Sequence, residues 1–183
     1  MVLIAFFCFC AIETTAGLWA SSYMVGSRGV AAEIAASFTA LFYLGETVGR
    51  FLNGVIADKF GDKRMIRVGA IGMLVGIGMI LLPLPTDGVA LCGLVILGLG
   101  AAPVYPCIIH ATPVNFGKEN SQSLVGIQMA SAYCGATFMP PVFGLIAQFA
   151  DVSLYPVFLG IFAVLLLVLT ETVNKILAKQ EVF

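Results

Sequence analysis

Residues 54–64 read Gly54-Val55-Ile56-Ala57-Asp58-Lys59-Phe60-Gly61-Asp62-Lys63-Arg64, a charged stretch within a chain built mostly of hydrocarbon side chains. Of the 183 residues, 60% are hydrophobic and only 10% are charged, whereas soluble domains carry roughly 25% Asp, Glu, Lys and Arg. The net charge of −1 gives no reason to expect a nucleic-acid partner. The composition therefore indicates a protein of the lipid bilayer whose charges are concentrated in a few places.

Hydrophobic runs on both sides of this stretch are long enough to cross a bilayer, which takes about 20 residues. They lie at residues 2–25, 34–57, 66–83, 88–110, 122–149 and 153–170. Each run should be helical, because the bilayer core offers no hydrogen-bond partner to an open backbone. We therefore expect an all-α membrane protein in which residues 1–183 form a single bundle of six transmembrane helices.

Basic residues at the ends of these runs and between them gather on one side of the predicted helices. The side that holds residues 54–64 carries Lys59, Lys63, Arg64, Arg67, Lys118, Lys175 and Lys179. The opposite side carries Arg28. Since basic loops stay in the cytoplasm, we expect a multi-pass protein of the inner or plasma membrane with both termini cytoplasmic.

The residues that usually hold metals or perform catalysis are sparse. The five cysteines all lie in apolar runs without a CxxC pair, which is typical of small buried side chains. His110 is the single histidine, and we expect it to be solvated at a helix end. An intramembrane serine protease would need a Gly-x-Ser-x-Gly-type serine and a facing histidine, and that serine motif is missing. We expect no enzyme activity, no metal site and no cofactor.

The charged stretch fits the pattern Gly-x-x-x-Asp-(Arg/Lys)-x-Gly-x-(Arg/Lys)-(Arg/Lys), and so resembles the cytoplasmic loop signature of the major facilitator superfamily. The matching positions are Gly54, Asp58, Lys59, Gly61, Lys63 and Arg64. Gly54 would permit tight packing, Asp58 could accept backbone hydrogen bonds at a neighbouring helix start, and Gly61 suits a positive φ. A plain basic loop would need neither the glycines nor the aspartate. The resemblance implies a loop that gates a transport cycle and does not contact the substrate.

Three longer stretches resemble the fucose-permease-like branch of this superfamily. Residues 40–54 (ALFYLGETVGRFLNG), 98–106 (GLGAAPVYP) and 126–133 (GIQMASAY) are similar to its eighth, tenth and eleventh helices. The resemblance implies the C-terminal six-helix half of a twelve-helix carrier, made of two inverted three-helix repeats. It also implies secondary active transport of a sugar or a similar small polar solute by alternating access.

The first half of such a carrier is missing from this sequence, and Met1 lies inside the first apolar run. We therefore expect a fragment or a split-gene product that needs the N-terminal half as its partner. A homodimer that transports by itself is an alternative, and a non-transporting membrane scaffold is another. A scaffold would have no need of polar stripes on its helices.

One such stripe lies in the second predicted helix, where Glu46, Arg50 and Asn53 share a face with Tyr43 at the 100° step of an α-helix. It should face the bundle or water, because a charge at mid-bilayer costs about 2.5–3.5 kcal/mol. Glu46 and Arg50 have the i,i+4 spacing of an ion pair. The pair either locks the packing of helices or breaks and reforms as a carrier rocks.

Four further residues are candidates for contact with a solute. Glu13, in the middle of the first helix, either contacts the solute, carries a coupling proton, or bonds to Arg50 without a transport role. Gln128 could bond to a sugar hydroxyl or to a neighbouring helix. Trp19 and Tyr23 could stack on a sugar or anchor the helix at the outer interface.

Small residues also recur at the spacing that allows helices to approach closely. They form the pairs Gly45-x-x-x-Gly49, Gly72-x-x-x-Gly76 and Gly98-x-x-x-Ala102. Such pairs are common in membrane helices, so their number is more informative than any single pair. We expect close contacts among the second, third and fourth helices.

Overall fold

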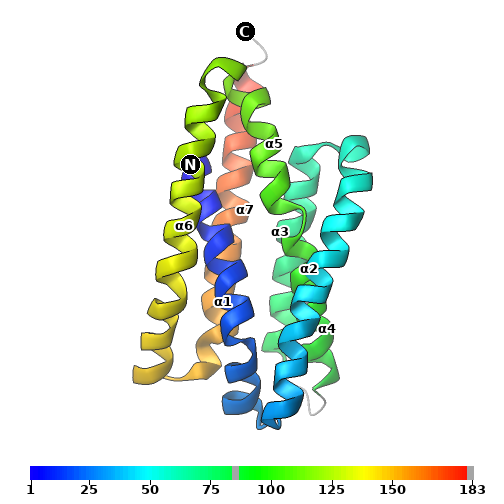
Figure 1. Ribbon diagram of the computed structural model, residues 1–183, viewed down its shortest axis with the longest axis vertical. Helices are drawn as coiled ribbons and strands as arrows, with labels where there is room; N and C mark the ends of the chain where they lie inside the picture. Colours follow the sequence, from blue (N-terminus) through cyan, green and yellow to red (C-terminus); the bar gives the residue numbers. More distant parts are fainter. Residues whose placement is uncertain (84–86, 181–183) are drawn as a thin grey trace.

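A computed structural model describes residues 1–83 and 87–180, without the side chains of Asp58, Lys118, Asn120 and Gln180. The helices of this part of the chain run along its long axis (Figure 1). They are α1 (Val2–Arg28), α2 (Ala32–Phe60), α3 (Asp62–Leu81), α4 (Gly88–Ala101), α5 (Val104–Phe116), α6 (Lys118–Phe149), the short 3-10 helix η1 (Val152–Leu154) and α7 (Tyr155–Gln180).

Five segments of the described chain are long and apolar enough to cross a membrane, as judged by length and composition. They are Val2–Arg28, Asp62–Leu81, Gly88–Phe116, Ser121–Phe149 and Val152–Lys179. The remaining long helix, α2, is also helical over the predicted run at 34–57, but it carries the polar stripe of Glu46, Arg50 and Asn53. α2 is therefore not among these five segments, and it carries more charged residues than any other helix of the described chain.

Several helices extend beyond the apolar runs that predicted them. The helix expected at 153–170 continues as α7 to Gln180, and the one expected at 66–83 begins at Asp62 as α3. Glu171 and Lys175 have a favourable i,i+4 spacing in the extension of α7. A hydrophobic run predicts only the part of a helix that lies in the hydrocarbon of the membrane. Polar turns at the ends of the helix are therefore missed by a prediction from hydrophobicity.

The segment expected as one helix at 88–110 is divided into α4 and α5. The break falls at Ala102 and Pro103, and α5 continues to Phe116. Pro103 and Pro106 have no backbone N–H, so both remove a hydrogen bond from the helical ladder. The run 103–106 therefore interrupts the helix, as its two prolines suggest.

Two sharp turns at the same end of the bundle each depend on one glycine. Gly61 joins α2 to α3 with φ 78° and ψ 151°, and Gly117 joins α5 to α6 with φ 84° and ψ 149°. This region of backbone space is open essentially to glycine alone. The positive φ predicted for Gly61 is confirmed.

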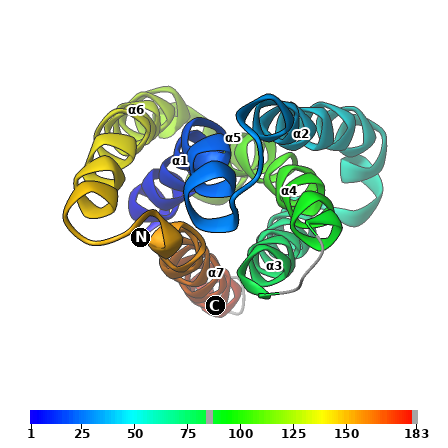
Figure 2. The same cartoon turned by 90° about the horizontal axis from the view of Figure 1, so that it is seen from below.

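Six of the helices pack into two groups of three, which Figure 2 shows along the bundle axis, and α5 contacts both groups through α3 and α6. In one group α1 packs against α6 and α7, and in the other α4 packs against α2 and α3. Contacts between α1 and α2 and between α3 and α7 join the two groups. Each group therefore combines two helices from one half of the sequence with a helix from the other half.

Small residues bring the helices of the second group into backbone contact, as their spacing predicted. A Cβ placed on Gly76 would lie 2.6 Å from the Gly93 carbonyl oxygen of α4. A Cβ on Gly98 would collide with the Phe42 carbonyl of α2. These contacts replace side-chain packing by close backbone approach, which is the usual way that membrane helices associate.

Candidate functional site

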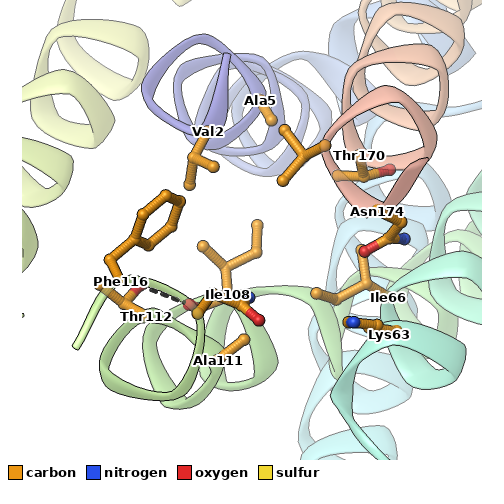
Figure 3. A pocket seen from close by; sticks show the side chains of 12 residues that line it. Val2, Ala5, Lys63, Ile66, Ile108, Ala111, Thr112, Phe116, Thr170 and Asn174 are labelled. Carbon is orange, nitrogen blue, oxygen red and sulfur yellow. Dashed lines mark hydrogen bonds between the residues drawn. The ribbon is translucent and has the colours of Figure 1, made fainter. Parts of the chain in front are cut away.

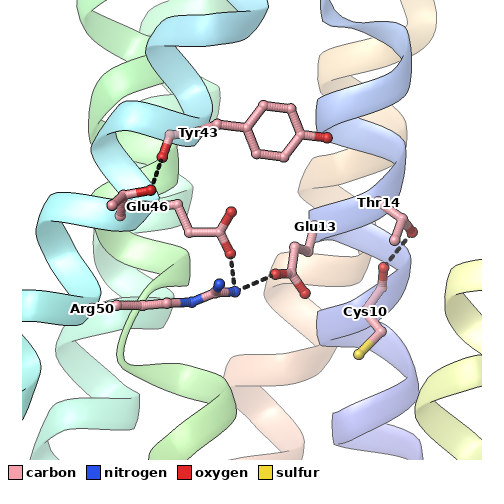
Figure 4. A network of polar contacts seen from close by, with 7 residues as sticks. Cys10, Glu13, Thr14, Tyr43, Glu46 and Arg50 are labelled. Atoms are coloured by element: carbon pink, nitrogen blue, oxygen red, sulfur yellow. Dashed lines mark hydrogen bonds and ion pairs between the residues drawn. The ribbon is translucent and has the colours of Figure 1, made fainter.

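Three charged side chains meet where α1 lies beside α2 (Figure 4). Glu13 comes from the middle of α1, and Glu46 and Arg50 lie one turn apart on α2. The Arg50 guanidinium donates from Nη2 to Glu13 Oε1 at 2.8 Å and also to Glu46 Oε1. The predicted i,i+4 pair and the cross-helix bond, which was one of the alternatives for Glu13, therefore form together on one nitrogen.

The three side chains of this cluster differ in their exposure. Glu46 is 6% exposed and Glu13 18%, whereas Arg50 is 52% exposed. With all three ionised, two carboxylates and one guanidinium leave one net negative charge. The carboxylates therefore lie inside the protein, and the cation that joins them is open on the flank of the bundle.

Tyr43 lies one turn before Glu46 and extends from α2 to α1 (Figure 4). Its ring is seated against Gly17, where an added Cβ would lie 2.7 Å from the Cζ atom of the ring. Gly17 thus leaves room for the tyrosine between the two helices. The polar stripe predicted the direction of Tyr43, but its contact with α1 was not predicted.

Asn53 lies one turn beyond Arg50 and is buried against α5. Its Oδ1 accepts a weak bond from Cys107 Sγ at 3.7 Å. A pocket beside it extends to Asp62 and His110. His110 is exposed as predicted, but its Nδ1 also lies 2.8 Å from Asp62 Oδ2, a pairing that the sequence did not reveal.

Gln128 and Trp19 lie in contacts between helices, apart from the charged cluster. Gln128 is buried and accepts a hydrogen bond from Thr112 Oγ1 at 3.0 Å, which joins α5 to α6. Trp19 donates from Nε1 to the Pro140 carbonyl of α6 at 3.1 Å. These bonds correspond to the helix-to-helix alternative for Gln128 and give Trp19 a role in packing α1 on α6.

Tyr23 is buried near the C-terminal end of α1, so it is not placed as an interfacial anchor. Its hydroxyl donates to the Ile80 carbonyl of α3 at 3.2 Å, and its ring stacks on Tyr155 with centroids 5.1 Å apart. Tyr23 thus joins α1 to α3 and α7. The positions of Trp19 and Tyr23 are set by their hydrogen-bond partners on α6 and α3. The spacing of residues within α1 could not reveal these partners.

The charged stretch at the α2–α3 turn is open to solvent. Lys59, Lys63 and Arg64 are exposed, and the side chain of Asp58 lies outside the described residues. The close packing predicted for Gly54 is wrong within this bundle, because a Cβ there would meet no atom within 4 Å. Gly54 lies on the exposed face of α2, and no helix of the described residues covers it.

Among the described residues, no group of three or more His, Cys, Asp or Glu side chains is arranged to hold a metal ion. The cluster of Glu13, Glu46 and Arg50 can instead exchange hydrogen bonds with a polar solute or accept a proton. It has donors and acceptors together, and its cation is accessible from outside the bundle. This arrangement is suited to reversible binding.

Comparison with known proteins gives a family match and a curated relative. The family model described as Major Facilitator Superfamily matches residues 1–178. A curated relative from Drosophila melanogaster, named "Putative inorganic phosphate cotransporter", is 29% identical over 132 residues, which are 67% of this chain and 24% of the relative. The match thus spans about a quarter of the length of that relative.

Proposed function

The chain belongs to the Major Facilitator Superfamily, and from this premise we propose that it is the C-terminal half of a twelve-helix secondary carrier. The proposed cargo is a sugar or a similar small polar solute, and the proposed branch is the fucose-permease-like one. In this proposal a second six-helix bundle packs against the exposed flank of α1 and α2. The two bundles rock to open the solute site to either side of the membrane.

The observation that carries this proposal is the half-exposed Arg50 between the buried Glu46 carboxylate and the partly buried Glu13 carboxylate. A charge that faces acyl chains near mid-bilayer costs about 2.5–3.5 kcal/mol, so we expect this flank to face water or protein. The open surface at Gly54 supports the same conclusion, since a small residue without a neighbour invites close approach by another helix.

The two groups of three helices support the proposed inverted repeats. The first helix of each sequence half packs with the last two helices of the other half, α1 with α6 and α7 and α4 with α2 and α3. Such an exchange between halves is the pattern expected if 1–81 and 88–180 are equivalent units. Solute sites of such carriers lie near mid-membrane, and Glu13, from the middle of α1, meets Arg50 where the two groups of helices adjoin.

The charge of the cluster favours a neutral solute that moves with a proton. A sugar hydroxyl can donate to Glu13 and accept from Arg50, and a proton would neutralise the surplus carboxylate. The name of the fly relative favours a second candidate, inorganic phosphate. Phosphate would be repelled by the ionised cluster, so its binding to Arg50 would require a proton or a cation to enter with it.

The charged stretch would act as a latch at the cytoplasmic end in this proposal. Lys59, Lys63 and Arg64 are exposed beside the rigid Gly61 turn, in reach of a second bundle. Asp58 would complete the latch. Both termini would then be cytoplasmic, in the inner or plasma membrane.

Uptake into proteoliposomes tests the proposal. The chain is reconstituted alone and together with an N-terminal six-helix half, and labelled sugars or phosphate are supplied with a proton gradient. We expect uptake only with both halves, and loss of uptake in Arg50→Ala but not in Lys179→Ala, which removes an exposed charge far from the cluster. Uptake by the chain alone, with a native mass of two copies, would favour a homodimer.

A Glu13→Gln variant separates the two transport roles left open for that residue, solute contact and proton coupling, from a bond to Arg50 without a transport role. Unchanged uptake with unchanged pH dependence would remove Glu13 from the mechanism and leave it a packing role. Absence of uptake under every condition, from protein shown to be folded, would favour a scaffold over a carrier.

A further inference from the structure

A basic pocket lies at the end of the bundle where α2 turns into α3. Lys59, Lys63 and Arg64 line it together with Asn115 of α5. Among the described side chains that line it, the acidic one is Asp62, and that carboxylate already faces His110 at 2.8 Å. The pocket therefore presents a surplus of positive charge at the level where a helix leaves the membrane.

An apolar pocket adjoins the basic one and extends into the bundle (Figure 3). Its cavity volume is about 40 Å³, well below the range of about 300–1,000 Å³ that is usual for sites that enclose a whole ligand, so it can admit only a short segment of an acyl chain. Figure 3 shows Val2 of α1 facing Ile108 and Phe116 of α5 across this space. Of its polar residues, Lys63 and Asn115 also line the basic pocket, whereas Thr112, Thr170 and Asn174 do not.

The two pockets share Lys63, Ala111 and Asn115. On its far side the apolar pocket shares Val2 and Phe116 with a third pocket, a groove that α6 and α7 line with apolar side chains. The order is therefore a cationic surface, then an apolar interior, then an apolar groove at the side of the bundle. This order of surfaces is complementary to an amphiphilic molecule that has an anionic head and an apolar tail.

We propose that this end of the bundle binds an acidic phospholipid of the leaflet that meets it, with the phosphate on Lys63 and Arg64 and an acyl chain against Ile108 and Phe116. Basic pockets between membrane helices attract anionic headgroups, and the adjoining apolar space gives the lipid an advantage over a soluble phosphate. The assignment stands whether or not the chain carries a solute, because it uses neither Glu13 nor Arg50.

In this proposal the charged stretch at residues 54–64 binds a ligand without the help of a second bundle. Lys63 and Arg64 begin α3, directly after the Gly61 turn. A lipid held there would link the start of α3 to the end of α5 and to α7. It would thus compete with any second bundle for the same basic residues.

Native mass spectrometry tests this assignment on the purified chain. The protein is offered an equal mixture of phosphatidylglycerol and phosphatidylcholine with identical acyl chains. Since each basic residue near a headgroup favours an anionic lipid by about fivefold, we expect at least that preference for phosphatidylglycerol. Equal retention of the two lipids would overturn the proposal.

Matched variants locate the lipid. We expect Lys63→Gln with Arg64→Gln to abolish the preference, whereas Lys179→Gln, which removes a charge at the same end but outside the three pockets, should leave it intact. Both sets of residues are exposed, so the variants should fold. A preference that survives the double variant, or that falls equally in Lys179→Gln, would contradict this position.

A third arm separates a lipid from a soluble phosphate. Millimolar inorganic phosphate or glycerol 3-phosphate should not displace bound phosphatidylglycerol, and Phe116→Ala should weaken its retention while the basic residues remain. Complete displacement by inorganic phosphate, with no effect of Phe116→Ala, would identify an anion site without a lipid tail and overturn the proposal.

Discussion

The seam between α3 and α4 and the flank formed by α1 and α2 join helices in opposite ways. At the seam, Gly76 and Gly93 bring the two backbones into direct contact, with no charged group between them. At the flank, α1 and α2 are joined by Arg50 between two carboxylates and by Tyr43 against Gly17. One contact is continuous and apolar, and the other consists of a few polar side chains.

This difference indicates which contact can change during a working cycle. Close backbone packing is lost all at once when helices separate, because dispersion contacts fall off over a fraction of an ångström. Hydrogen bonds of Arg50 can be exchanged one at a time for bonds to water or to a solute. The seam is therefore suited to a rigid body, and the flank to a surface that binds and releases.

The largest effect should follow from a side chain placed in the seam. Gly76→Leu puts a Cβ 2.6 Å from the Gly93 carbonyl oxygen and 2.6 Å from the Leu97 nitrogen. Overpacking of this kind typically costs about 1–3 kcal/mol and sometimes more, so we expect little folded protein. The free energy of unfolding, measured by SDS titration in mixed micelles, checks it.

Gly78→Leu is the control for that variant on the same helix. A Cβ at Gly78 would meet no atom within 4 Å, and we expect stability to stay within about 0.5 kcal/mol of the original. If both leucine variants fold equally well, the seam is not a rigid backbone contact, and the comparison between the two regions fails.

An intermediate effect should follow from removal of the cation at the flank. Arg50→Met leaves the buried Glu46 carboxylate without its donor, which costs about 1–3 kcal/mol. We expect the protein to fold, to be less stable by that amount, and to lose transport. The same SDS titration and the uptake assay measure the two effects.

Combining Arg50→Met with Glu46→Gln sharpens this result. The double variant should recover part of the lost stability, because a neutral amide is less costly to bury than a carboxylate, but it should not recover transport. Recovery of both properties would show that the cluster serves packing alone, as the seam does.

The smallest effect should come from the ion pair that joins the two helix groups at their charged end. Arg67 of α3 donates from Nε and Nη2 to Glu171 of α7 at 2.5 and 2.6 Å. Both side chains are partly exposed, so the pair should contribute about 0.2–1 kcal/mol. We expect Arg67→Ala to lower stability by no more than this.

Salt provides the control for that variant. Screening of exposed charges increases with ionic strength, so the effect of Arg67→Ala should shrink toward zero at high salt, whereas that of Gly76→Leu should not. An Arg67→Ala effect as large as that of Arg50→Met would show that the two groups depend on this pair to stay together.

The helices and their short-range pairs could be predicted from the sequence. Hydrophobic runs gave the positions of the helices, and the i,i+4 spacing gave the Glu46–Arg50 pair. The two prolines at 103 and 106 are visible in the sequence, and they account for the break between α4 and α5. These features depend on residues that are close along the chain, so a single sequence contains the information.

The side-chain contacts between distant helices could not be predicted. They depend on how the helices cross, and the spacing of residues within one helix does not determine the crossing. The bond from Arg50 to Glu13 was one of several alternatives until α1 was seen beside α2. The contact of His110 with Asp62 and the burial of Tyr23 likewise join distant segments. Gly54 was expected to pack closely because it belongs to the charged loop motif. It is open because no helix of the described residues reaches it.

The central claim is that the flank of α1 and α2 faces an aqueous solute site shared with a second bundle, and thiol labelling of the chain together with an N-terminal half in membranes tests it most directly. Tyr43 on the flank is 46% exposed, and Val164 on α7 is 50% exposed, so the two positions differ in surroundings and hardly in exposure. Each is replaced by cysteine after the exposed Cys92 and Cys134 are changed to serine. The probe is a charged, water-soluble methanethiosulfonate.

We expect Tyr43→Cys to react readily, because water reaches the flank, and Val164→Cys to remain unlabelled, because acyl chains cover it. Both variants should react after solubilisation in denaturing detergent, which controls for thiol reactivity. If Tyr43→Cys is as protected in the membrane as Val164→Cys, the flank faces lipid or a sealed contact, and the account of Arg50 as part of an open solute site is contradicted.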